Sequence, residues 1–376
     1  MQIADLEHLM EQHPEVDVLA QQLSKKGNSH FLLSGLYASA RGMILAALHS
    51  RLKQKGSAPT MLIVMDNADD AQYMYADIKT LLQTQDIYYF PNSHRRRQGK
   101  DEAMAVQRTE VLSALLNAMH SLEDASLQDG SKTAYSLKAR PIIVTYPEAL
   151  AEIVPQPQSL QSKTISLSVG EEIAISQLAE MLIELDFKRV DFVYEPGQFA
   201  VRGGIVDVYS YACDIPVRID FFGDEVDSIR EFELETQLSK NKVDRINIVA
   251  SSADEQAMTD ITAYLPPKTL WISNDFGLAS YKIKSAITEF DASILTQAME
   301  DASTIELNQK STYPTHHLVA FDTLPQPTFN KNFDLLIDDL QQRTKDGYRI
   351  YILADQVKQT DRLKAIFDDK ESGIEF

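Results

Sequence analysis

Cysteine is nearly absent from this sequence of 376 residues, in which Cys213 stands alone. A single cysteine excludes an intrachain disulfide and a zinc site made of several cysteines, and it is typical of a reducing compartment. Long apolar runs are also missing, since the longest, 43–48, is far shorter than the roughly 20 residues that span a membrane. The N-terminus has no basic segment ahead of an apolar stretch, which argues against a secretion signal. We therefore expect a cytoplasmic protein without membrane segments.

Positive charge is scarce as well. Lys and Arg number 36 against 55 Asp and Glu, which gives a formal net charge of −19. Such an acidic chain is poorly suited to coat duplex DNA, because neutralising phosphates needs a cationic surface. The composition, 44% hydrophobic and 24% charged, is that of a globular protein, and the length suits two or three domains.

Short apolar strands and amphipathic helices alternate up to about residue 155, a pattern typical of an α/β domain with a parallel sheet. The stretch 121–136 is rich in Ser and Asp and predicts a loop insertion. The expected strands are 31–33, 61–65, 87–90 and 142–145, and the expected helices are 43–52, 71–82 and 109–119.

Beyond residue 155 the hydrophobic period changes to two, after one helix at 175–186. The alternation predicts short strands joined by tight turns, and hence a small antiparallel α+β hairpin unit inserted into the α/β chain. From 247 to 324 the pattern is weaker, with one clear strand at 269–272. The expected strands of the insert are 198–202, 205–209, 217–222 and 225–232.

A Pro-containing connector at 323–332 leads to a helix, a strand and a second helix at 333–343, 348–353 and 356–367. A single strand has no sheet to join, so this pattern predicts the start of a further small α/β domain. We expect the sequence to be part of a longer protein.

Residues 34–42, at the turn from the first strand to the first helix, resemble a phosphate-binding loop that has lost its chemistry. A working loop needs G-x-x-x-x-G-K-[ST], which supplies a backbone cradle, a lysine on the phosphate and a hydroxyl on magnesium. Gly35 keeps the first glycine. Ala40, Arg41 and Gly42 replace the second glycine, the lysine and the hydroxyl. We favour a structural strand–turn–helix joint that holds neither nucleotide nor metal.

Three weaker signals also favour structural interpretations. Asp66 and Asn67 follow a buried strand as in the acidic box of an ATPase, but an amide cannot act as a general base, and a helix cap fits better. The basic run 95–97 fits a solvated loop better than a phosphate-binding patch. His316 and His317 are adjacent and do not share a face, which argues against metal binding. No catalytic or metal-binding residue is predicted.

The strand predicted at 217–222 has an unusual polar face. Its first, third and fifth residues are apolar and would face a core, whereas Arg218, Asp220 and Phe222 share the other face. Arg202 belongs to a neighbouring predicted strand, and its side chain is also expected on the side opposite to the apolar residues of that strand. An exposed aromatic ring beside two arginines has the composition of a protein-interface hot spot, and a scattered surface Phe is the alternative.

The insert also carries a family resemblance. Tyr194–Val208 reads YEPGQFAVRGGIVDV, Pro216–Glu225 reads PVRIDFFGDE, and Ser228–Arg230 and Glu235–Gln237 continue the pattern. Together they closely resemble the UvrB-homology module that the excision-repair protein UvrB shares with the bacterial transcription-repair coupling factors. UvrB carries an intact phosphate loop, so the decayed loop is similar to that of the coupling factors.

The resemblance implies an architecture. A degenerate helicase-like (P-loop NTPase-like) α/β domain would occupy 1–155 and 245–324, and an inserted UvrA-binding domain would occupy 156–244. Residues 325–376 would begin a further small α/β domain.

It also implies a function. Arg202, Arg218 and Phe222 would contact UvrA and recruit it to stalled RNA polymerase in transcription-coupled nucleotide excision repair. This part of the chain would have no enzyme activity and no cofactor. In full-length family members, RNA polymerase binding and a double-stranded DNA translocase that uses ATP and Mg²⁺ would lie beyond residue 376.

Two alternatives stay open at this point. The first is a UvrB-type, DNA-dependent ATPase that binds nucleotide at 35–42 with Arg41 on the phosphate. The second is weak DNA contact through 95–97, which would collapse with salt.

Overall fold

The computed structural model describes residues 8–25, 27–84, 86–93, 102–127, 140–213, 215–250, 257–287, 290–352, 354, 356–370 and 372–374. The chain divides into two units, Met1–Thr323 and Leu324–Phe376.

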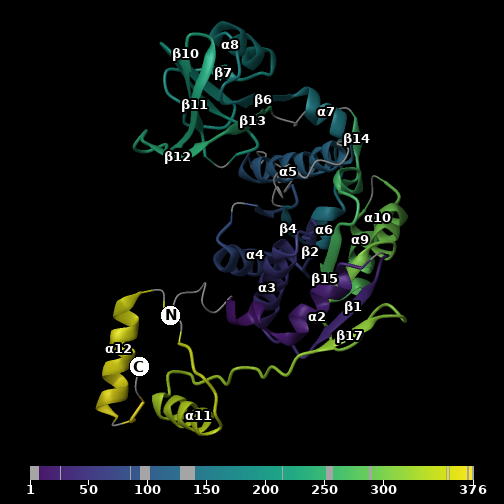
Figure 1. Ribbon diagram of the computed structural model, residues 1–376, viewed down its shortest axis with the longest axis vertical. Helices are drawn as coiled ribbons and strands as arrows, with labels where there is room; N and C mark the ends of the chain where they lie inside the picture. Colours follow the sequence, from purple (N-terminus) through teal and green to yellow (C-terminus); the bar gives the residue numbers. More distant parts are fainter. Residues whose placement is uncertain are drawn as a thin grey trace. The chain divides into compact units, whose positions relative to one another are not determined.

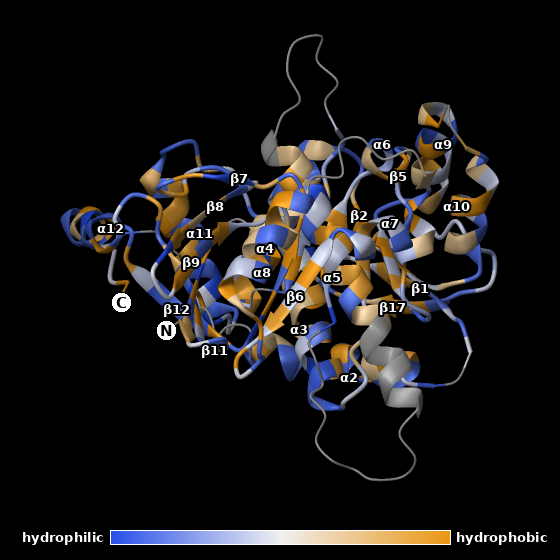
Figure 2. Cartoon of the chain, turned by 90° about the horizontal axis from the view of Figure 1, so that it is seen from above, coloured by the Kyte–Doolittle hydropathy of each residue, from blue (hydrophilic) through white to orange (hydrophobic). Residues whose placement is uncertain are grey.

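The first unit contains a seven-stranded parallel sheet in the order β17-β1-β16-β15-β2-β4-β3 (Figure 1). Its inner strands are short apolar runs buried on both faces, as helices on the two sides of a parallel sheet require. Hydrophobic residues, orange in Figure 2, follow these strands. The bounds are β1 His30–Ser34, β2 Met61–Val64, β3 Ile87–Tyr89, β4 Ile142–Thr145, β15 Leu270–Ser273, β16 Ser303–Glu306 and β17 His317–Ala320.

The helices of this unit follow the predicted ones, with one clear correction. Helix α5 runs from Glu102 to Leu127, so the loop predicted at 121–136 is wrong for 121–127, and the rest of it lies outside the described residues. Leu, Glu and Ala within 121–127 are strong helix formers and extend the helix despite two serines. The other helices are α2 Pro14–Leu23, α3 Ala40–Gln54, α4 Ala68–Leu82, α6 Pro147–Leu150, α7 Pro157–Ser162, α9 Phe276–Ala286, α10 Ala292–Glu300 and the 3₁₀ turn Ile261–Tyr264.

Between β4 and β15 the chain forms a separate six-stranded, mostly antiparallel sheet in the order β12-β11-β10-β9-β8-β7. One face packs with α8, Ile175–Glu184, around a second hydrophobic core. The predicted α/β fold with an inserted antiparallel unit is confirmed. The strands are β7 Lys188–Arg189, β8 Gln198–Arg202, β9 Ile205–Tyr209, β10 Val217–Phe222, β11 Glu225–Phe232 and β12 Ser239–Val243.

Two short strand pairs join the entry and exit of this insert. β6, Thr164–Ser168, pairs with β13, Arg245–Val249, and β5, Val154–Pro155, pairs with β14, Met258–Thr259. Ile246, Ile248 and Ala250 belong to the second core, whereas Val249 belongs to the core of the parallel sheet. Residues 246–250 therefore contact both cores.

The second unit consists of α11, Phe333–Lys345, and α12, Val357–Asp369, around Ile337, Leu340 and Phe367. The strand predicted at 348–353 is wrong, because 348–352 form no strand. An apolar run becomes a strand only when it exchanges backbone hydrogen bonds with a neighbouring strand. No described segment pairs with 348–352.

Burial of His49 on α3 predicts acid-sensitive stability. Desolvation, followed by the charge of Lys53, lowers the pKa of His49 from 6.5 to about 4, and its Nδ1 has no hydrogen-bond partner in the described part of the chain. The unfolded chain therefore binds this proton more readily than the folded chain. The contribution of His49 to stability should be intact above pH 6.5 and be lost as the pH falls towards 4, by about 3 kcal/mol in all.

Denaturant unfolding at several pH values checks this expectation. His49→Leu should flatten the dependence of the unfolding free energy on pH between 6.5 and 4, because Leu fills the buried site without a titrating group. The exposed His317 offers a matched control, and His317→Leu should leave the dependence unchanged. An equal slope in the wild type and in His49→Leu would contradict the prediction.

Candidate protein-binding site

The turn after β1 has the position of a phosphate-binding loop, but another part of the chain lies against it. Gly35 has φ +75°, and a Cβ there would be 1.8 Å from the Phe321 carbonyl oxygen. The Thr323 hydroxyl donates to the Gly35 carbonyl and accepts the Tyr37 N–H at 3.3 Å. Helix α3 then begins at Ala40. Backbone groups of this turn are therefore engaged by residues 321–323.

Arg41 also bonds within the fold. Its Nη1 donates to Asn274 Oδ1 at 3.1 Å, and its Nε donates to the Leu36 carbonyl at 3.4 Å. Gly42 packs against α4, where an added Cβ would be 3.3 Å from Asp77 Cβ. Gly35, Arg41 and Gly42 thus each have a structural role in joining β1, α3 and their neighbours.

The side of the inserted sheet opposite α8, here called the outer face, collects charged side chains. Register places Arg218 of β10 opposite Asp207 of β9 and Arg230 of β11. Directly opposed residues of antiparallel strands share a face. By the same pairing Arg202 and Asp220 both lie opposite Ile205, one row further along.

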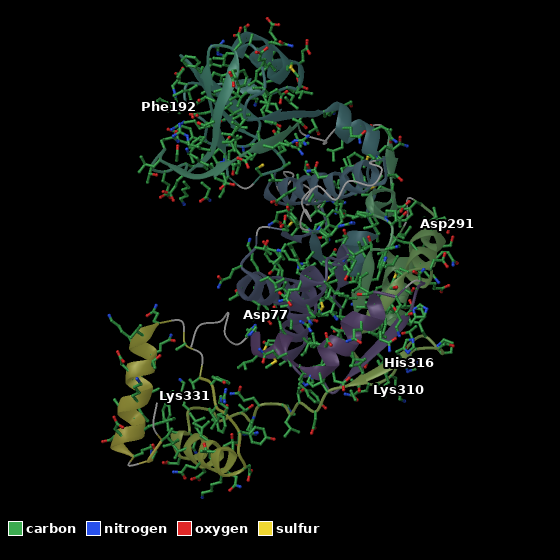
Figure 3. The ribbon with its side chains drawn as sticks, viewed as in Figure 1. Asp77, Phe192, Asp291, Lys310, His316 and Lys331 are labelled. Carbon is green, nitrogen blue, oxygen red and sulfur yellow. The ribbon has the colours of Figure 1, made fainter. Side chains whose placement is uncertain are left out.

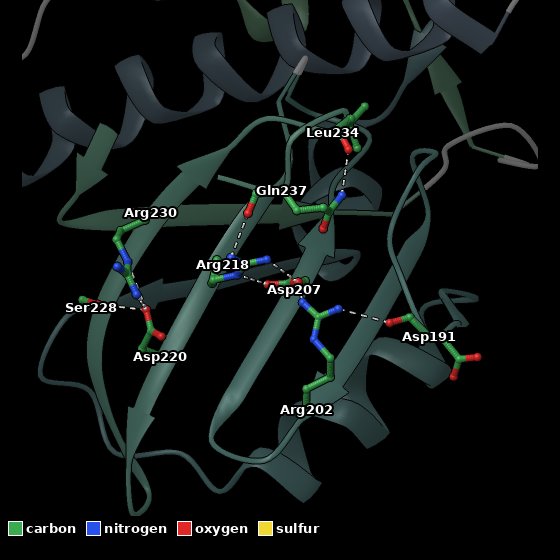
Figure 4. A network of polar contacts seen from close by, with 9 residues as sticks. All are labelled: Asp191, Arg202, Asp207, Arg218, Asp220, Ser228, Arg230, Leu234 and Gln237. Carbon is green, nitrogen blue, oxygen red and sulfur yellow. Dashed lines mark hydrogen bonds and ion pairs between the residues drawn. The ribbon is translucent and has the colours of Figure 1, made fainter. Parts of the chain in front are cut away.

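Asp207 is the centre of the outer face. The Arg218 guanidinium donates to both of its carboxylate oxygens, at 2.7 and 3.0 Å, and Arg202 Nη2 donates to Oδ2 (Figure 4). Only 1% of the Asp207 side chain is exposed, against 16% for Arg218 and 35% for Arg202. The hydrogen bonds to Asp207 raise the pKa of Arg218. The two arginines predicted from the sequence are therefore brought together by one buried carboxylate.

Each of the two guanidinium groups also contacts a backbone carbonyl and an aromatic ring. Arg202 Nη1 donates to the Asp191 carbonyl at 3.2 Å, and Arg218 Nη1 donates to the Gln237 carbonyl at 3.2 Å. The Arg202 guanidinium carbon lies 5.0 Å from the centre of the Phe192 ring, which is seen at the surface in Figure 3. Arg218 lies 4.7 Å from the ring of Phe232, which is buried. Both cations are thus held by an acceptor and an aromatic face.

Phe222 is the most exposed aromatic side chain of the insert, with 81% of its surface accessible. It ends β10 and alternates with Phe221, which packs against the inner core, so Phe222 belongs to the outer face. Other large apolar side chains of the insert are exposed as well, namely Phe192, Tyr194 and Leu238, and Phe192 is the one that contacts Arg202 within the described residues.

A second ion pair on the outer face is separate from the first. Asp220 accepts from Arg230, through Nε at 3.1 Å and through Nη2, and from the Ser228 hydroxyl at 3.1 Å. Within the described part of the chain, Asp220 forms no hydrogen bond with Arg202 or Arg218, and only its charge contributes to the raised pKa of Arg218. Asp220 is therefore a matched comparison for Asp207.

Comparison with known proteins finds a family match within the insert. Residues 165–253 match the family described as the UvrB interaction domain. The chain is also similar to proteins named transcription-repair-coupling factor: it is 29% identical to that of Bacillus subtilis over 223 residues and 25% identical to that of Staphylococcus aureus USA300 over 226 residues. The resemblance inferred from the sequence is confirmed.

These alignments cover 59% and 60% of the chain but only 17% of each relative. The chain therefore corresponds to a small part of the proteins it resembles.

The other candidate residues lie outside 165–253 in the sequence. Asn67 caps α4 by accepting the Asp70 N–H at 3.0 Å, which confirms the helix-cap interpretation. The basic run 95–97 lies outside the described residues. In the described ranges no group of three or more His, Cys, Asp or Glu is placed to hold a metal ion. Within the same ranges, no helix has both the length and the apolar character needed to cross a membrane.

Proposed function

We propose that this chain recruits UvrA in transcription-coupled nucleotide excision repair, through the outer face of its UvrB interaction domain. The observation that supports this most is the exposed ring of Phe222 on the same face as Arg202 and Arg218, whose guanidinium groups are already fixed in position. Protein interfaces favour arginine and aromatic anchors of this kind. The names of the relatives support the link to transcription and repair.

The remaining parts of the proposal concern the whole protein. The parallel-sheet domain would be a degenerate helicase-like scaffold without catalytic activity. The insert would interrupt this domain in the sequence, and residues 325–376 would follow it. The cytoplasmic full-length protein would bind RNA polymerase and double-stranded DNA through other regions and translocate along DNA with ATP and Mg²⁺.

Calorimetric titration of the 376-residue chain with UvrA tests the docking step. We expect saturable binding with a defined stoichiometry. Heats of dilution alone, with a folded chain confirmed by circular dichroism, would contradict the proposal.

The geometry of the Gly35 turn predicts that the chain does not bind ATP at micromolar concentrations. Arg41 is engaged by Asn274 and by the Leu36 carbonyl, the hydroxyl ligand for magnesium is replaced by Gly42, and the Thr323 hydroxyl accepts a backbone N–H of the turn. Equilibrium titration with a fluorescent ATP analogue and Mg²⁺ should give no saturation up to about 1 mM. A Kd of about 1 mM corresponds to a binding free energy of only about −4.1 kcal/mol. Saturable binding that Arg41→Ala abolishes would favour the UvrB-type ATPase instead.

A further inference from the structure

Two positive charges next to each other on the outer face need a physical explanation. Arg202 and Arg218 both donate to Asp207, so their guanidinium groups lie within a few ångströms of one carboxylate. Like charges at this separation repel, and each arginine also loses rotamer entropy when it is fixed. Without Asp207, both side chains would gain by turning away from each other into water.

Asp207 itself cannot touch a partner protein, because 1% of its side chain is exposed. It also does not cancel the positive charge of the site, since one carboxylate faces two guanidinium groups. One positive charge and the unused N–H groups of Arg202 remain on the more exposed side, where 35% of that side chain is accessible.

We propose that Asp207 is a positioning residue for partner binding: it holds Arg202 and Arg218 in the conformation in which they meet UvrA. The proposal rests on the proposed function of the outer face. Its physical basis is preorganisation, since a side chain fixed before binding does not have to be ordered during binding. The Phe192 and Phe232 rings and the two backbone carbonyls complete the support, but among the described residues Asp207 is the one hydrogen-bond partner that both arginines share.

Asp207→Asn is the test variant, measured by titration of UvrA at a temperature where circular dichroism shows the chain folded. The amide keeps the shape and an acceptor oxygen but lacks the charge that attracts both guanidinium groups. We expect affinity for UvrA to fall about tenfold, because the two arginine side chains would then have to be ordered during binding. Asp220→Asn, which breaks the Asp220–Arg230 pair on the same face, should change affinity less than threefold.

A double-mutant cycle separates positioning from a general loss of structure. In the Arg202→Ala and Arg218→Ala backgrounds, Asp207→Asn should reduce affinity clearly less than the tenfold expected in the wild-type background. One of the two arginines that Asp207 holds is already missing there. The same loss in all three backgrounds, or wild-type affinity in Asp207→Asn, would overturn the proposal.

A measurement without UvrA distinguishes the positioning role of Asp207 from the proposed UvrA binding. In the wild type the Arg218 Nε–H should exchange slowly with solvent and give a resolved NMR signal, because it is hydrogen-bonded to Asp207 at 2.7 Å. Asp207→Asn should accelerate this exchange. If the wild type fails to bind UvrA while the exchange behaves as expected, the proposed function is wrong. Unchanged exchange would refute the positioning role directly.

Should Asp207→Asn not fold, Asp207→Glu provides the second variant. It keeps the negative charge near both arginines and moves it by one methylene, so the fold should persist while the guanidinium groups are displaced. Reduced affinity for UvrA is expected, and wild-type affinity in this variant would count against positioning.

Discussion

Phe222→Ala is expected to weaken UvrA binding by about 30-fold or more and to leave thermal stability unchanged. The ring is 81% exposed, so its removal creates no cavity in the fold. At an interface the same ring would be covered together with Arg202 and Arg218, and truncation of such an anchor costs at least about 2 kcal/mol, which corresponds to the 30-fold change. Titration calorimetry and thermal unfolding of the same samples measure the two quantities.

Tyr73→Ala is the control for Phe222→Ala. Tyr73 lies on α4 and is similarly exposed, but it is outside the inserted sheet. Its replacement should change neither affinity nor stability. Full affinity in Phe222→Ala would show that the exposed ring is a scattered surface residue, and equal losses in both variants would show a nonspecific effect of removing surface aromatics.

The outer face could be predicted from the sequence only in part. Alternation along 217–222 indicated that Arg218 and Phe222 share a face, because each strand carries this information by itself. Asp207 was missed, although a charged residue in the apolar strand Ile205–Tyr209 is a visible signal. Its importance depends on which residues lie opposite it on β8 and β10, and register is set by strand pairing rather than by local sequence.

The strands of the parallel sheet were also predictable only in part. Strands made of consecutive apolar residues, such as 61–64 and 142–145, were predicted with almost correct bounds. β16 was missed because it ends in Glu306, a residue that is buried and accepts hydrogen bonds from the Phe276 N–H at 3.1 Å and the Thr312 hydroxyl at 2.6 Å. A sequence pattern cannot show that a polar group will be satisfied by segments distant in the chain.

Gly35→Ala is expected to destabilise the first unit by about 2–5 kcal/mol. An L-residue at φ +75° loses about 1–2 kcal/mol through backbone strain. In addition, the new Cβ would be 1.8 Å from the Phe321 carbonyl oxygen, and both atoms belong to backbone that cannot turn aside like a flexible side chain. Relieving such a clash adds about 1–3 kcal/mol. Denaturant unfolding followed by Trp271 fluorescence reports on the sheet, because that buried ring belongs to β15.

Gly203→Ala separates the two effects. Gly203 has φ +61° in the turn between β8 and β9, and an added Cβ would meet no atom within 4 Å. Its replacement should therefore cost only the strain of about 1–2 kcal/mol. If Gly35→Ala costs no more than Gly203→Ala, the segment 321–323 is not pressed against the turn after β1, and the argument that this segment occupies the turn fails. If Gly35→Ala costs clearly more, the packing of 321–323 closes the turn, so introducing Gly, Lys and Thr at 40–42 should not by itself produce nucleotide binding.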